Sequence, residues 1–150
     1  MNTQYLVAKI VIVSILLIVA IRISAQQQNR NVKDALAEAE KVYANDASSG
    51  IEEFKKVIAE FKDDTQTILP VRFRLGELLY NARFTKTNGY VRDKKGALEQ
   101  FQEIVKYGQA ITNYGVAQFN VAKILGELWQ TKEAIKEYRK LIDSPVKDGD

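Results

Sequence analysis

Beyond residue 30 the chain repeats apolar residues at helical spacing, without the alternation of apolar and polar positions that is typical of half-buried strands. A first helix is predicted over residues 31–44, followed by a turn over 45–50 and a second helix over 51–62. Capping residues at 63–65 then precede a third helix that is predicted to continue to Arg83. The first two helices make one antiparallel hairpin.

The rest of the chain predicts two further hairpins. The second begins with the third helix and contains a long turn within residues 84–95, where Asn88-Gly89 is a strong turn dipeptide. The third hairpin covers residues 111–142, and Pro145 follows its last helix as a stop signal. The predicted fold is therefore all-α: a short solenoid of about three helical hairpins over residues 31–145, with a C-terminal tail over 146–150.

An apolar run over residues 10–21, interrupted by Ser14 alone, precedes this domain. As a helix it spans about 18 Å, which is shorter than the roughly 30 Å hydrocarbon core of a bilayer. Ala25, before the polar linker at 26–30, resembles a cleavage site, so residues 1–25 are predicted to be a signal peptide.

The alternative is an uncleaved membrane anchor, in which the helix extends over residues 6–23 and the flanking Lys9 and Arg22 reach the interface. Both interpretations place the domain outside the cytoplasm, in the periplasm or envelope. They differ in whether the domain is released or stays attached to the membrane.

Composition excludes several chemistries. The chain has no cysteine and no histidine, which removes disulfides, thiol nucleophiles, imidazole bases and the usual zinc, copper and haem ligands. Of the 22 basic residues two lie within residues 1–25, so residues 26–150 carry 20 basic against 19 acidic groups. This balance does not favour nucleic-acid binding. No catalytic group, cofactor site or metal site is expected, and the protein is not predicted to be an enzyme.

The third hairpin resembles a tetratricopeptide repeat. The residues that carry the resemblance are Val121, Ala122, Leu125, Ala134, Tyr138 and Leu141. Leu75, Gly76, Ala97, Phe101 and Ile104 match the second repeat, with nine extra residues between its helices. Residues 54–61 and 133–138 are similar to exported tetratricopeptide proteins of bacterial envelopes, where such hairpins organise multiprotein assemblies.

The resemblance implies a concave partner-binding face formed by the first helix of each hairpin. The residues placed there are Phe73, Glu77, Tyr80, Asn81, Phe119, Lys123 and Glu127. Two phenyl rings beside mixed charges suit an extended or helical segment of a partner, although the rings are also suited to packing between helices. The family's clamp for C-terminal carboxylates is not expected, because Phe73 and Glu77 occupy two of its positions.

The insertion is a second candidate surface, because its basic residues are interleaved with Phe84 and Tyr90. The basic residues are Arg83, Lys86, Arg92, Lys94 and Lys95. They suit an acidic protein surface or anionic headgroups, whereas the alternative is a solvated loop.

The expected function is a non-catalytic protein-binding scaffold, or an accessory subunit of an extracytoplasmic multiprotein complex. Its partners would be other subunits of that complex. The alternative is a structural protein that self-assembles through the end faces of its hairpins.

Overall fold

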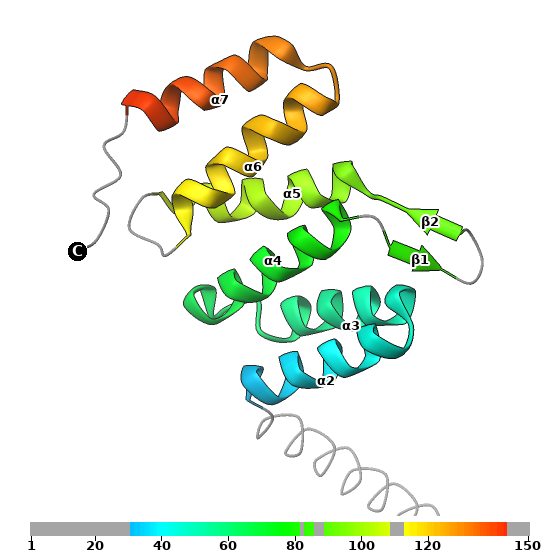
Figure 1. Cartoon of the computed structure of the whole chain (residues 1–150). Helices are drawn as coiled ribbons and strands as arrows, with labels where there is room; N and C mark the ends of the chain where they lie inside the picture. The colour runs from blue at the N-terminus through cyan, green and yellow to red at the C-terminus, as the bar shows by residue number, and fades with distance from the viewer. Residues whose placement is uncertain (1–30, 82, 86–88, 109–112, 144–150) are drawn as a thin grey trace, which may run out of the picture.

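The computed structural model describes residues 31–81, 83–85, 89–108 and 113–143. Six helices and one two-stranded hairpin lie within these ranges (Figure 1). In chain order they are α2 (Val32–Asn45), α3 (Ala47–Glu60), α4 (Thr65–Tyr80), β1 (Arg83–Thr85), β2 (Gly89–Val91), α5 (Lys94–Val105), α6 (Tyr114–Glu127) and α7 (Thr131–Asp143). The predicted segment at 1–25, the linker at 26–30, Lys86 and the tail at 146–150 lie outside the described residues.

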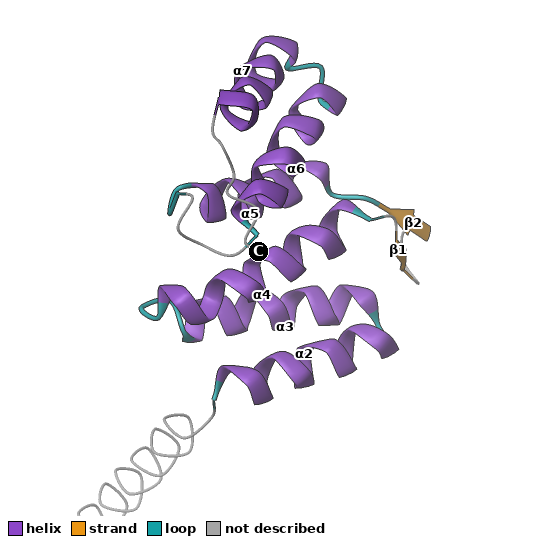
Figure 2. Ribbon diagram, turned by 60° about the vertical axis from the view of Figure 1, so that its left-hand side comes forward, coloured by secondary structure: helices purple, strands orange, loops and turns teal. Residues whose placement is uncertain are grey.

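The helices pack pairwise in sequence order. Helix α2 packs on α3, α4 on α5 and α6 on α7, while α3–α4 and α5–α6 contacts join successive pairs. Figure 2 shows the resulting stack, with α2 at one end and α7 at the other. The predicted all-α fold of three helical hairpins is confirmed. None of the helices in the described part of the chain is long and apolar enough to cross a membrane.

Side-chain caps define four helix starts. In each, a side-chain oxygen accepts a hydrogen bond from the backbone amide three residues later, which satisfies one of the free donors of the first turn. The capping residues are Asn31, Asp46, Asp64 and Asp93. The predicted turn over 45–50 was wrong, because Asp46 caps a helix that already begins at Ala47.

The insertion folds as a β-hairpin, so the expectation of a domain without strands was wrong at this point. Helix α4 ends at Tyr80 rather than at Arg83, and β1 pairs antiparallel with β2. Each strand has three residues, too few to show an alternating pattern in the sequence. Gly89 has a φ of +67°, which agrees with the turn predicted from the Asn-Gly dipeptide.

The second helices of all three hairpins carry one pattern: a small residue, an aliphatic residue, an aromatic residue and two adjacent aliphatic residues. In α3 they are Gly50, Ile51, Phe54, Val57 and Ile58; in α5 Ala97, Leu98, Phe101, Ile104 and Val105; in α7 Ala134, Ile135, Tyr138, Leu141 and Ile142. The first hairpin therefore repeats the same unit as the other two, although it shows the weakest match from sequence.

Small residues allow the two helices of a hairpin to approach each other closely. A Cβ atom at Gly50 would lie 2.3 Å from the Cα atom of Tyr43 in α2. A Cβ atom at Gly76 of α4 would lie 2.9 Å from the ring of Phe101 in α5. Phe54 and Phe101 are among the largest fully buried side chains, and one apolar core runs through the stack.

Candidate protein-binding surface

Tyr80, at the end of α4, contacts residues from two other segments of the chain. Its hydroxyl donates a 2.5 Å hydrogen bond to Oε1 of Glu127 in α6. The Lys123 Nζ atom lies 4.6 Å from the centre of the Tyr80 ring, and the Arg92 Cζ atom lies 5.2 Å from it. Both distances suit a cation–π interaction. Tyr80, Lys123 and Glu127 were predicted as site residues, and the structure brings these three together.

Glu127 also forms an ion pair with Lys94 of the insertion. Lys94 Nζ lies 2.9 Å from Oε2 of Glu127, an oxygen that is buried and accepts no hydrogen bond from the described residues. We define the Tyr80 cluster as Tyr80, Arg92, Lys94, Lys123 and Glu127. It connects α4 and the start of α5 in the second hairpin with α6 in the third hairpin, so it braces one hairpin against the next.

The contacts in the cluster shift the pKa values of Glu127 and Lys123. The pKa of Glu127 is lowered, first by the hydrogen bond from Tyr80 and then by Lys94, while burial opposes the shift. The pKa of Lys123 is raised, mainly by the interaction of its ammonium with the Tyr80 hydroxyl. Both shifts favour the charged form, so the cluster keeps its charges at neutral pH.

The basic insertion meets the α4–α6 face at this cluster. Lys94 is used internally, whereas Arg92 and Lys95 are exposed, and neither forms an ion pair within the described residues. Arg83 lies in β1, where one guanidinium nitrogen is 3.5 Å from the carbonyl oxygen of Leu78 and Nε is buried without a partner in the described part of the chain. The two candidate surfaces from sequence are therefore adjacent at Tyr80.

A second polar group lies where α2 meets α4. Arg74 donates to both carboxylate oxygens of Glu40, at 2.6 and 3.2 Å, and lies 3.6 Å from Glu77. The hydrogen bond with Glu40 is the main cause that raises the pKa of Arg74. Glu77, a predicted site residue, is thus part of an ion-pair group separate from Tyr80. Together the two groups form a polar face shared by α2, α4 and α6.

Three other predicted residues lie apart from the cluster. Phe73 is half-buried, with its ring edge-on to Phe101 at 5.6 Å, so it contributes to packing. Asn81 is the C-cap of α4, and its backbone amide donates to the carbonyl oxygen of Glu77. Phe119 is exposed and contacts Tyr138 of α7 at 5.9 Å between ring centres. The phenyl pair expected on one face is therefore divided between the core and the third hairpin.

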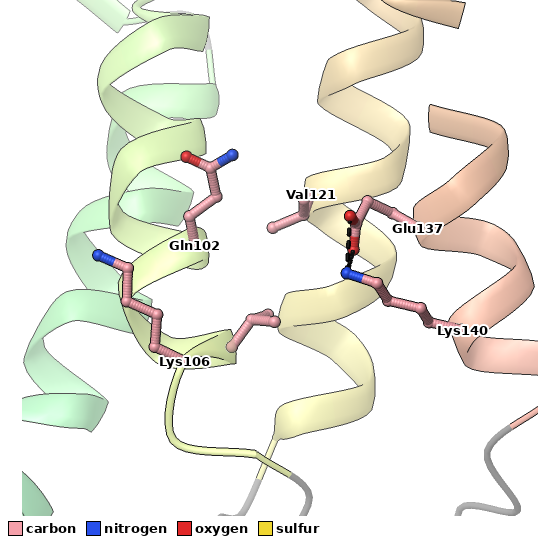
Figure 3. Close-up of a pocket in the computed structure, with 6 residues that line it drawn as sticks. Gln102, Lys106, Val121, Glu137 and Lys140 are labelled. Atoms are coloured by element: carbon pink, nitrogen blue, oxygen red, sulfur yellow. Dashed lines mark hydrogen bonds and ion pairs between the residues drawn. The ribbon is translucent and has the colours of Figure 1, made fainter. Parts of the chain in front are cut away.

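A groove between α5, α6 and α7 was not predicted from the sequence. Its volume is about 510 Å³, and Val121 lies between the two outer helices that line it (Figure 3). Lys140 contacts Glu137 at 2.8 Å, and the buried Gln118 donates to Glu137 at 2.5 Å. Burial alone would raise the pKa of Glu137, but the hydrogen bonds from Lys140 and Gln118 outweigh it and lower the pKa. The charge is thus neutralised internally.

The described residues hold no group of three or more acidic side chains that could hold a metal ion. Comparison of the chain with protein-family models, curated proteins and solved structures finds no match.

Glu127→Gln is expected to lower the free energy of unfolding by about 1 kcal/mol at neutral pH, because it removes the charge that Tyr80 and Lys94 stabilise. The pKa of Glu127 in the folded protein is below its ordinary value of 4.5. Its stabilisation is therefore complete above that ordinary value and is lost as the pH falls through the lower folded pKa. Urea melts at about pH 7 and pH 3.5 should show a difference between variant and wild type that shrinks at acid pH.

Glu99→Gln, at an exposed position in the middle of α5, is the matched control. It should change stability little at either pH. A Glu127→Gln deficit of equal size at both pH values would contradict the electrostatic account of the cluster.

Proposed function

We propose that this protein is a non-catalytic binding scaffold that holds another protein, as tetratricopeptide-like proteins do. The observation that carries the proposal is the meeting of two surfaces at Tyr80. The Tyr80 cluster joins the second and third hairpins, and it includes the exposed Arg92, with the exposed Lys95 next to Lys94 in the chain. Such an arrangement suits an acidic segment of a partner, because the basic groups are held on a braced surface.

A scaffold role is also supported by the way the polar groups are used. The carboxylates of Glu40, Glu127 and Glu137 each contact a basic, amide or phenol group of a neighbouring helix or residue. Catalysis needs a nucleophile or a base that faces a bound substrate. The carboxylates of the cluster and the groove are instead paired internally, which is typical of structural bracing.

We further propose that the domain works outside the cytoplasm as a subunit of an envelope complex. The apolar run at 10–21 and the Ala25 boundary support export, as a cleaved signal peptide or as an anchor. The mass of the native protein distinguishes these forms, since cleavage gives a first residue at Gln26. An intact chain in the soluble cytoplasmic fraction would contradict export.

Reversal of two exposed charges, in the double variant Arg92→Glu and Lys95→Glu, is expected to weaken partner association at least about tenfold. The partner is obtained by co-purification with the full chain from the native envelope. Association with the wild-type protein should also weaken as salt rises from about 0.05 to 0.5 M, because screening shortens the range of exposed charges.

The double variant Lys33→Glu and Lys41→Glu is the control, because it makes the same charge change on exposed positions of α2. It should bind as the wild type does. Equal loss in both double variants, or a partner whose association is insensitive to salt and to both variants, would reject the basic surface as the docking site.

A further inference from the structure

The third hairpin exposes an apolar surface at the end of the stack. We define the C-terminal end face as Phe119 of α6 with Ile135, Tyr138 and Ile142 of α7. Phe119 and Tyr138 are in ring contact, and the three α7 residues are spaced three and four apart, so they form one row on the helix. Ile142 is 81% exposed, although isoleucine is among the residue types most often buried.

The repeated helix pattern shows that these positions are normally covered. Ile51 of α3 and Leu98 of α5 are 4% and 9% exposed, but the corresponding Ile135 of α7 is 47% exposed. Phe54 and Phe101 are 0% and 1% exposed, but the corresponding Tyr138 is 36% exposed. The residues have the same character in each helix, and they differ in whether another helix lies on them.

In each of the first two hairpins, the second helix is covered by the first helix of the next hairpin. Helix α4 packs on α3, and α6 packs on α5, whereas nothing within the described residues packs on the outer side of α7. The shape that fits the C-terminal end face is therefore a single helix laid along α7, as α6 lies along α5.

The buried residues of α6 indicate which residue types such a covering helix needs. Its residues toward α7 include Gln118, which donates to Glu137, and Gly126, which lies near Ala134. The other buried row of α6 is Ala117, Val121 and Ile124, at i, i+4 and i+7, and this row is left to face α5. A helix that covers α7 needs a similar row of small and aliphatic residues.

The basic residues beside the end face indicate which charge a partner helix should carry. Lys132, Lys136 and Arg139 form a second row on α7, adjacent to the apolar row and exposed. None of the three forms an ion pair within the described part of the chain. A helix that lies on the apolar row would place one flank against this basic row, so acidic residues on that flank are favourable.

We propose that the C-terminal end face binds one amphipathic helix of a partner protein, with aliphatic residues at i, i+4 and i+7 and acidic residues on one flank. The proposal adds a second surface to the scaffold function. Binding at the end face depends on α7, whereas binding at the basic surface depends on Arg92 and Lys95. An experiment can therefore reject one of these proposals without the other.

A second copy of the chain fits this face less well. The outer side of α2, at the opposite end of the stack, exposes Lys33, Asp34, Glu38 and Lys41 beside two alanines, Ala37 and Ala44. It therefore offers no row of larger aliphatic residues for head-to-tail stacking. A two-fold pair of α7 helices would bring two copies of the basic row into one interface, which like-charge repulsion opposes.

The test uses the full chain in non-ionic detergent micelles and two labelled helical peptides of about 18 residues, long enough to form a helix. Both peptides carry Ala, Val and Ile at i, i+4 and i+7, and they have either glutamate or lysine on the flank. Anisotropy, with empty micelles as the blank, should show at least about tenfold tighter binding of the glutamate peptide. Ile142→Asp should weaken that binding at least about tenfold, because it places a charge in the apolar row.

Ala44→Asp, an exposed position on α2, is the control and should bind as the wild type does. The double variant Lys136→Glu and Arg139→Glu should instead prefer the lysine peptide, a reversal that a misfolded protein would not produce. The proposal is overturned if the two peptides bind the wild type equally, if neither binds, or if Ile142→Asp binds unchanged. It is also overturned if sedimentation shows a dimer that Ile142→Asp dissociates, since a second copy would then cover the face.

Discussion

Phe101→Ala is expected to lower the free energy of unfolding by about 3–5 kcal/mol, the range for removal of a buried phenylalanine ring. Phe101 is 1% exposed, lies edge-on to Phe73 and fills the space that Gly76 leaves open. Removal of the ring leaves a cavity between α4 and α5. Urea unfolding followed by circular dichroism measures the effect.

Tyr138→Ala is the matched comparison, because Tyr138 occupies the corresponding position of α7 without a covering helix. Its loss should cost about 1 kcal/mol, mainly through the contact with Phe119. Equal losses for the two variants would mean that α7 is covered in solution or that Phe101 is not held as the structure shows.

Gly50→Ala is expected to lower the free energy of unfolding by about 2–3 kcal/mol, although alanine is the better helix former. The added Cβ atom would lie 2.3 Å from the Cα of Tyr43, so α2 and α3 must move apart. The backbone atoms of Tyr43 cannot move aside as the end of a flexible side chain can. The midpoint of urea unfolding should fall accordingly.

Gly126→Ala should have the opposite sign, with a gain of about 0.5–1 kcal/mol from helix propensity. Its added Cβ atom would meet Ala134 at 3.9 Å, an ordinary contact. If Gly50→Ala were as stable as the wild type, the close packing of the first hairpin would be wrong.

The hairpin order could be predicted from the sequence because small and aromatic residues recur at fixed spacing in the second and third hairpins. The residues at which helices begin and end were harder to predict from the sequence. Asp46 resembles a turn residue in the sequence, yet its carboxylate caps the next helix, and Gly50 lies inside that helix because Tyr43 occupies the space of a Cβ. Such tertiary contacts override local turn signals.

The candidate site was predictable in part. The resemblance to a repeat placed Tyr80, Lys123 and Glu127 on one face, and the structure joins them. The sequence did not show that Lys94 reaches Glu127. Phe73 and Phe119 were expected as a pair, and only the packing shows that Phe73 turns to Phe101. Tyr138 occupies the aromatic position of the repeated pattern, and no further hairpin lies on it within the described residues.

The central claim, that this protein holds other proteins, is tested most directly by photo-cross-linking in native cells. A photoreactive amino acid replaces Ile142 in the full chain, and mass spectrometry identifies the peptide bound there. The expected product is a segment of a different protein with aliphatic residues at i, i+4 and i+7 and acidic residues on one flank. The same amino acid at position 44 should give no such product. A cross-link to a second copy of this chain, or equal products from positions 142 and 44, would contradict this claim.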